Sequence, residues 1–232
     1  MKPNPAKINS QKKANIKNPN KTTPNKTTPN KTRGNTKTSR AQWLAEARNL
    51  LIHGGVENVK IDRLSKNLKV SRGGYYWFFQ NRQHILDLLL ADWSDEKNDP
   101  LLNALNGQNA TPLEPFFRFF TRLLRERSYS PKLDSAMRDW GRHYKDAAEA
   151  VEQVDNRRIE ALRIAFLGLD YSPAEAFIRA RILYFHQIGY YSMKVIETET
   201  QRQQYLPIYF KQLTGFDLPD EILDRLYEND TN

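Results

Sequence analysis

The run from Val70 to Arg82, VSRGGYYWFFQNR, collects side chains suited to binding a polyanion. The guanidinium of Arg72 can pair with the O6 and N7 atoms of guanine or clamp a phosphate. Gly73 and Gly74 each cost about 1 kcal/mol in a helix interior, but they let the backbone approach another molecule closely. The alternative for this pair is an irregular helix start without contacts. Tyr76 could reach a phosphate with its hydroxyl while its ring packs. The chemistry indicated is nucleic-acid recognition.

Groups for other chemistries do not gather in the sequence. There is no cysteine, which excludes disulfides, cysteine-based zinc sites and thiol chemistry. The four histidines have no metal-ligand spacing, and the glycine motifs of phosphate-binding loops and of nucleophile turns are absent. The acidic residues are scattered as solvated surface charge. We therefore expect no catalytic residue, no metal and no cofactor, and an all-helical enzyme that carries this unit is a remote alternative.

Three short helices must position the run. Residues 39–52 have apolar side chains at helical spacing and end at Gly54-Gly55. A second helix has Ile61, Leu64 and Leu68 on its inner face, and a turn at Lys69-Val70 follows. Ser71 is expected to cap the third helix with its hydroxyl. The side chains expected inside are Val70, Tyr75 and Phe79, and those expected outside are Arg72, Gly74, Tyr76 and Trp77. This layout is typical of a helix-turn-helix that sets one helix in the major groove of DNA.

The same residues resemble the TetR-family signature, in which V-S-x-G is followed by Tyr, by Phe three residues later and by a basic residue. Here these are Val70-Ser71-Arg72-Gly73, Tyr76, Phe79 and Arg82. The resemblance covers residues 38–90 and implies a three-helix DNA-binding domain that leads into a helical ligand-binding and dimerisation domain. It implies phosphate contacts by Tyr76 and Arg82. The full expected DNA-binding set is Lys60, Ser71, Arg72, Gly73, Gly74, Tyr76, Trp77 and Arg82.

Three features of the sequence, at four positions, depart from the family pattern. Lys69 stands where the turn usually has Gly, and Lys60 replaces a Thr near the start of the second helix, which exchanges a cap for a charge that could reach a phosphate. Trp77 and Phe78 replace small residues or His. An exposed Trp77 would touch a sugar or a thymine methyl, whereas a buried one would brace the domain, and both outcomes are open.

The net charge of +9 is unevenly distributed. Residues 1–40 hold eleven basic and no acidic side chains, residues 41–90 carry +3, and residues 91–232 carry −5. Repeats such as NKTTP predict a disordered basic arm over residues 1–37, which either follows DNA phosphates or is a plain solvated tail. We expect the DNA-binding domain over residues 38–97 and a helical regulatory and dimerisation domain over residues 98–232.

The C-terminal part has helical spacing almost throughout. We expect a connecting helix from Gln83 to about Lys97, helices from Pro112 and from Pro131, and a helix over residues 146–167. A helix of about 25 residues should start at the Ser172 capping box, and a last one should cover residues 201–213 or start only at Pro207. The long helix carries an apolar stripe that would serve a dimer, which we favour, or an internal core: Ala176, Ala180, Leu183, Tyr184, Gln187, Ile188, Tyr191 and Val195.

The segments 136–140 and 154–158 resemble stretches of one TetR subgroup. That resemblance implies a cavity between the middle helices for a small effector of unknown identity, oriented by a few polar tips. Plain core packing is the alternative for every candidate. The candidate lining residues are Phe116, Phe120, Met137, Trp140, Tyr144, Phe185 and His186.

Together these patterns predict an all-α, cytoplasmic protein with no membrane partner, because no stretch reaches the roughly 20 apolar residues of a span. The resemblance implies a transcriptional regulator, and we expect a ligand-responsive repressor that binds a palindromic operator as a homodimer. The alternative is a non-specific, nucleoid-type DNA-binding protein whose basic arm supplies the affinity.

Overall fold

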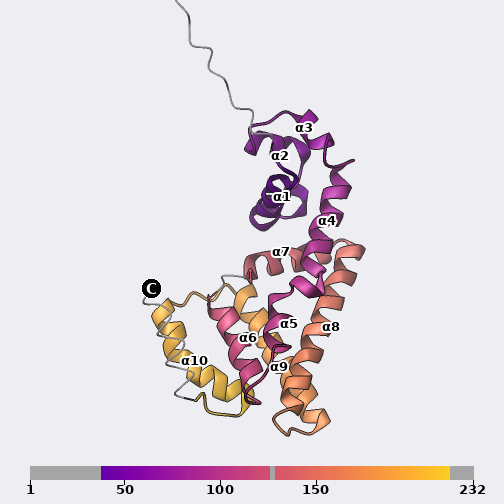
Figure 1. The fold of residues 1–232 in the computed structure, drawn as a ribbon. Helices are drawn as coiled ribbons and strands as arrows, with labels where there is room; N and C mark the ends of the chain where they lie inside the picture. The colour runs from indigo at the N-terminus through magenta and orange to yellow at the C-terminus, as the bar shows by residue number, and fades with distance from the viewer. Residues whose placement is uncertain (1–37, 126–128, 220–232) are drawn as a thin grey trace, which may run out of the picture. The chain divides into compact units, whose positions relative to one another are not determined.

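A computed structural model describes residues 38–125 and 129–219, which form α-helices and two short 3-10 helices and contain no strand (Figure 1). This confirms the all-α class. The predicted arm over residues 1–37 lies outside the described residues. The elements are α1 (Arg40–Gly54), η1 (Val56–Asn58), α2 (Ile61–Asn67), α3 (Arg72–Tyr76), α4 (Arg82–Ser94), η2 (Glu96–Asn98), α5 (Pro100–Leu105), α6 (Glu114–Arg125), α7 (Pro131–Gly141), α8 (Lys145–Leu167), α9 (Pro173–Ser192) and α10 (Glu199–Thr214).

Side-chain caps set several helix starts. The predicted capping box of Ser172 and Glu175 opens α9, and a second box, formed by Thr198 and Gln201, opens α10. α10 therefore begins before Pro207, which lies inside the helix, and the later start was wrong. α9 ends at Ser192, earlier than expected, and Lys194 just beyond it has a left-handed φ of 52°.

The first hydrophobic cluster joins α1 to α4 with α7. Trp43, Tyr75 and Phe79 lie at its centre, and α7 contributes Met137 and Trp140. Of the two alternatives for these α7 residues, the structure shows core packing, because they fill the space against the N-terminal helices and are almost fully buried there. The domain boundary at 97/98 stays a prediction, and hydrophobic packing crosses it at α7.

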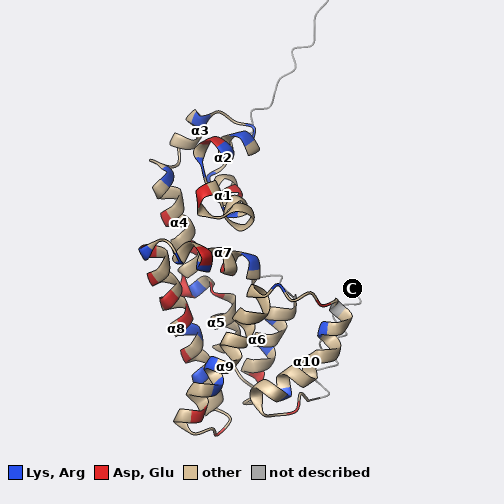
Figure 2. Ribbon diagram, turned by 180° about the vertical axis from the view of Figure 1, so that it is seen from behind, with Lys and Arg blue, Asp and Glu red and all other residues tan. Residues whose placement is uncertain are grey.

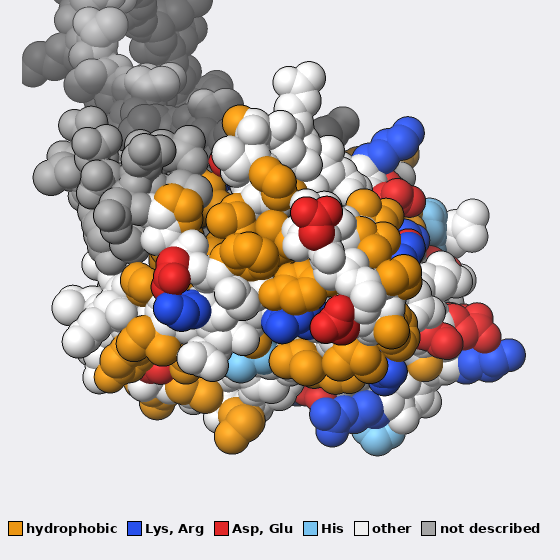
Figure 3. All heavy atoms as spheres, turned by 90° about the horizontal axis from the view of Figure 1, so that it is seen from below, with side chains coloured by type: hydrophobic (Ala, Val, Ile, Leu, Met, Phe, Trp, Pro, Cys, Tyr) orange, Lys and Arg blue, Asp and Glu red, His pale blue; other side chains and the backbone are white. Residues whose placement is uncertain are grey.

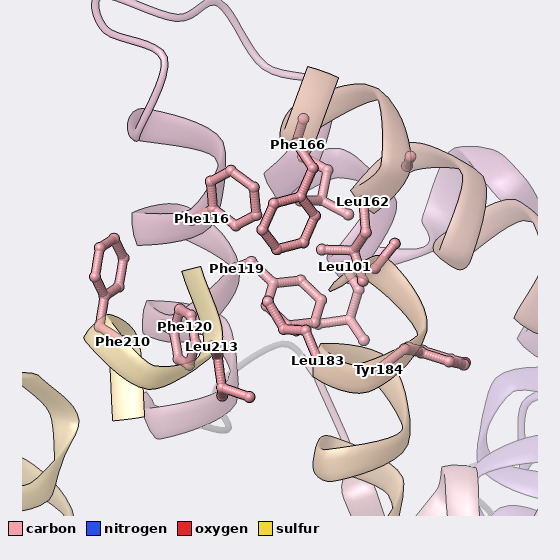
Figure 4. Packing of buried hydrophobic residues seen from close by; sticks show 14 of the residues in the cluster. Leu101, Phe116, Phe119, Phe120, Leu162, Phe166, Leu183, Tyr184, Phe210 and Leu213 are labelled. Carbon is pink, nitrogen blue, oxygen red and sulfur yellow. The ribbon is translucent and has the colours of Figure 1, made fainter. Parts of the chain in front are cut away.

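The second cluster is formed by α5, α6, α8, α9 and α10. Figure 4 shows Phe116, Phe119 and Phe120 of α6 beside Phe166 of α8, with Phe210 of α10 across from Phe120. The predicted apolar stripe of α9 points into this cluster at Ala176, Ala180, Leu183, Tyr184 and Gln187. The stripe therefore serves the internal core, and our preference for a dimer contact at these residues was wrong.

A buried ionic cluster holds α5, α7, α8 and α9 together. Arg158 of α8 donates to Asp99, at the start of α5, and to Asp134 of α7. Arg138 of α7 pairs with Asp155 of α8 at 2.7 Å and donates to the Tyr184 hydroxyl of α9 at 3.0 Å. The cluster fixes the junction between α4 and α5 relative to the C-terminal helices.

Candidate DNA-binding face

Helix α3 is held from its inner side by Tyr75. This side chain is fully buried, meets Trp43 edge to face at a centroid distance of 5.4 Å, and lies 5.0 Å from Phe79. Its hydroxyl donates to the carbonyl oxygen of Asn81 at 2.8 Å. Burial raises the pKa of Tyr75 to about 12, so the hydroxyl keeps its proton and remains a donor. The opposite face of α3 is consequently free to contact another molecule.

That opposite face carries aromatic side chains that the fold does not cover. Tyr76 is 59% exposed and Trp77 is 86% exposed, while Phe79 is buried as predicted. Of the two outcomes left open for Trp77, the structure shows the exposed one. An exposed tryptophan on this face has no packing role within the described chain, and it is available to a sugar or a thymine methyl.

Neither glycine of α3 is required by the packing of the domain. A Cβ atom at Gly73 would lie 3.7 Å from Ser71 Oγ, and one at Gly74 would lie 3.8 Å from Trp43 Cζ2, both ordinary contact distances. Neither residue has a positive φ. The cost of two glycines in a helix therefore has no explanation inside the described fold, which favours close approach by an outside partner.

The turn before α3 differs from the prediction at one residue. Ser71 occupies the N-cap position, but its hydroxyl accepts no helix amide, so the predicted side-chain cap was wrong. Instead its carbonyl accepts the amide of Gly74 at 3.1 Å, and the residue is exposed. Lys69 adopts a φ of 56°, the left-handed geometry for which the family pattern has glycine.

Basic side chains surround the exposed face of α3. Figure 2 shows Lys and Arg segments on α2 and α3. Lys60, Arg63, Lys66 and Lys69 are all exposed, and Lys60 is the N-cap residue of α2 without a capping side-chain bond. Arg72 forms an ion pair with Asp62 at 2.5 Å, and both side chains are largely in solvent. Such a pair is weak, so Arg72 can exchange it for a base or a phosphate.

Arg82 has internal partners. Its Nε donates to the carbonyl of Val59 at 2.7 Å and its Nη2 donates to the carbonyl of Val56 at 2.6 Å. These bonds connect the first turn of α4 to η1 and to Val59, which directly follows η1. The expected phosphate contact stays a prediction, and the geometry adds a structural role that the spacing of basic residues did not indicate.

Three more of the predicted ligand-lining residues, Tyr144, Phe116 and Phe185, make contacts in different parts of the structure. Tyr144 is the N-cap residue of α8, is 44% exposed and donates to Glu57, a bond that lowers the pKa of the Glu57 carboxyl. Phe116 is core, 4.6 Å from Phe166. Phe185 is half exposed beneath the guanidinium of Arg181. The structure does not bring all seven residues to one cavity, because Phe116 is core and Phe185 lines a different pocket, between α7, α8 and α9.

Phe120 and His186 do share a cavity, which lies between α6, α9 and α10. The same cavity is lined by aromatic side chains that were not predicted, Tyr190, Tyr191 and Tyr209. Their positions depend on the packing of α10 against α6 and α9, which helical spacing within one segment does not reveal.

The helices that carry the candidate DNA-binding face also match a known protein family. Residues 44–89, from α1 into α4, match the family model described as "Bacterial regulatory proteins, tetR family". Over these residues the chain resembles the N-terminal segment of that family. No curated protein matches it in sequence. The family so described is one of bacterial regulatory proteins, and the matched segment contains α2 and α3.

Solved structures support the fold of this chain at low sequence identity. A transcriptional regulator from Rhodococcus sp. Rha1 superposes with a TM-score of 0.55 at 17% identity, covering 83% of this chain and 97% of that one. The reduced form of E. coli NemR gives 0.51 at 16% identity, with 82% and 95% covered. A TetR/AcrR-family transcriptional regulator from Thermobifida fusca gives 0.52 at 12%, with 76% and 94% covered.

The part of the chain that the structure describes supports neither a membrane-spanning helix nor a metal site. Over residues 38–125 and 129–219, no helix combines the length and apolarity that a membrane crossing needs. Within the same ranges, no three acidic or histidine side chains gather in a way that could hold a metal ion.

Proposed function

We propose that this regulator is a repressor that binds a palindromic operator as a homodimer through α3 and releases it when a small effector binds. The observation that carries the proposal is the outer face of α3, where Arg72, Tyr76 and Trp77 are exposed beside glycines that the fold does not require. A helix with such a face, flanked by lysines, suits the major groove and the adjacent phosphates.

A second face of α9 supports the homodimer. Phe177, Ile178, Ile182 and Phe185 are between 42% and 55% exposed on it, and Ile164 of α8 is 57% exposed. In Figure 3 hydrophobic side chains are spread over much of the face seen from below. Soluble monomers rarely leave such a surface in water. Self-association of α8 and α9 about a two-fold axis would bury it and present two copies of α3 to the two halves of a palindrome.

Release by an effector requires two conformations with different distances between the copies of α3. An effector that binds more tightly to the conformation with misplaced helices lowers operator affinity by the ratio of its two affinities. The buried ionic cluster around Arg158 supports such coupling, because it connects the C-terminal helices to the α4–α5 junction.

The test is selection of bound fragments from genomic DNA, followed by gel-shift competition at near-physiological salt. We expect one palindromic sequence to be enriched and to outcompete scrambled duplexes. Arg72→Ala should reduce this preference, whereas Lys60→Ala should weaken binding to all duplexes and make it less salt-dependent. Equal retention of every duplex by the wild-type protein would contradict the proposal and support a non-specific, nucleoid-type protein.

A further inference from the structure

The cavity between α6, α9 and α10 has the composition of a small-molecule site. It has a volume of about 70 Å³ and opens to solvent. Phe120 and Leu124 line it from α6, Tyr191 from α9, and Leu206 and Tyr209 from α10. Figure 4 shows Phe120 on α6, facing α10. An engineered apolar cavity about twice this size is known to admit benzene, so a partly open cavity of this size suits a single ring.

One polar atom of a residue that lines the cavity is buried without a partner. Gln187, a lining residue on α9, is only 4% exposed, and its Nε2 donates to the hydroxyl of Tyr129 at 2.6 Å. Its Oε1 accepts no hydrogen bond from any residue that the structure describes. Buried acceptors are nearly always paired, and an orphan that borders a cavity indicates a missing donor.

The neighbouring polar groups already have partners. The Tyr190 hydroxyl donates to Glu197 at 2.8 Å, and the Tyr191 hydroxyl donates to the carbonyl of Leu123 at 3.0 Å. The ring of His186 lies 5.1 Å from that of Tyr209, and burial lowers the pKa of His186, so the imidazole is neutral at neutral pH. Glu197 and Arg202, which also line the cavity, have partners as well. The cavity therefore offers aromatic surfaces and, at Gln187 Oε1, an acceptor to which no described residue donates.

We propose that this cavity binds a neutral, single-ring aromatic molecule that carries a hydroxyl or amino donor, a phenol or an arylamine, and that the donor bonds to Gln187 Oε1. The ring would pack edge to face or offset against the aromatic walls. The further assignment of this molecule as the effector rests on the proposed function as a ligand-responsive repressor.

The position of Gln187 gives the bound molecule a route to the DNA-binding helices. Its amide nitrogen bonds to Tyr129, and the guanidinium of Arg158 lies 5.9 Å from the ring centre of Tyr129. Arg158 in turn holds Asp99 at the start of α5 and Asp134 in α7. A change in the side-chain position of Gln187 on binding would thus act next to the ionic cluster that fixes the α4–α5 junction.

The test compares phenol with toluene, which has a methyl group in place of the hydroxyl, by calorimetric titration of the full chain. We expect phenol to bind the wild-type protein at least tenfold more tightly than toluene. Gln187→Met should remove this difference, and Leu124→Trp should abolish binding of both by filling the cavity. Because the wild-type comparison needs no variant, equal affinities for phenol and toluene, or no binding of either, would overturn the inference whether or not the variants fold.

A gel shift with the selected operator separates this inference from the proposed function. Release of the operator by phenol, lost in Gln187→Met, supports both. Phenol binding that depends on Gln187 while the operator stays bound supports the site and contradicts its role as the effector site. Operator binding with no phenol binding overturns the site and leaves the DNA-binding part of the proposed function standing.

Discussion

Arg158 Nε lies 2.8 Å from Asp99 Oδ2, and the two side chains are 3% and 2% exposed. The other carboxylate oxygen of Asp99 accepts the amides of Leu101 and Leu102 in the first turn of α5. The same guanidinium reaches Asp134 of α7 at 2.9 Å. One side chain of α8 thus neutralises two buried carboxylates on separate helices.

Arg158→Met should strongly destabilise the protein. It leaves Asp99 and Asp134 buried without their shared cation, and loss of one partner in a buried ion pair typically costs about 3–5 kcal/mol. Urea unfolding followed by circular dichroism measures the loss. The matched control is Arg142→Met, which removes a solvent-exposed pair with Asp139 and should change the urea midpoint little. Similar unfolding midpoints for the two variants would contradict the central role of Arg158.

Lys69→Gly should stabilise the N-terminal helices. Lys69 has a φ of 56°, which costs a residue with a Cβ about 1 kcal/mol more than glycine. Thermal melts of variant and wild type test this. Lys66→Gly, inside α2, is the opposite control and should cost about 1 kcal/mol, since glycine weakens a helix interior. A lower melting temperature for Lys69→Gly would show that the lysine side chain contributes a contact worth more than the backbone strain.

Gly73→Ala and Gly74→Ala should separate folding from DNA binding. An added methyl meets only ordinary contacts in the described domain, and alanine favours the helix by about 1 kcal/mol. Stability should be kept or raised, while duplex affinity should fall at least tenfold because the backbone of α3 is kept away from DNA. Melting curves and fluorescence anisotropy on the same samples measure both. Unchanged affinity would assign the glycines to an irregular helix start.

Arg82→Ala should lower stability by about 1–3 kcal/mol, because the carbonyls of Val56 and Val59 lose a charged donor. Arg82→Lys distinguishes this role from phosphate binding. A lysine keeps the charge but cannot reproduce two directed bonds, so it should restore stability only in part. If Arg82→Lys matched the wild type in both thermal stability and duplex affinity, the charge alone would matter.

Ile182→Glu should convert the proposed homodimer to a monomer, because it places a charge in the middle of the exposed apolar face of α9. Sedimentation velocity measures the assembly state, and circular dichroism verifies that the helices remain. Ala174→Glu changes an exposed residue in the first turn of the same helix and should leave the assembly unchanged. A dimeric Ile182→Glu protein would place the interface elsewhere.

The predictions that held depend on short-range patterns. The spacing of apolar residues placed α1 and α2, and the Ser172-Pro173 pair placed the start of α9, because a helix turn and its cap involve residues three or four apart. The inward direction of Tyr75 and Phe79 followed from the same periodicity. The family resemblance over residues 38–90 rests on such local constraints.

The sequence by itself thus determined the helical class, the three short N-terminal helices and the outward face of α3. Only the tertiary structure decided which face of α9 is core, that Met137 and Trp140 pack against the N-terminal helices, that Arg82 has carbonyl partners, and that Gln187 borders a cavity. These outcomes depend on contacts between residues far apart in the chain. A helical pattern states that a face is apolar, but it does not state which neighbour covers that face.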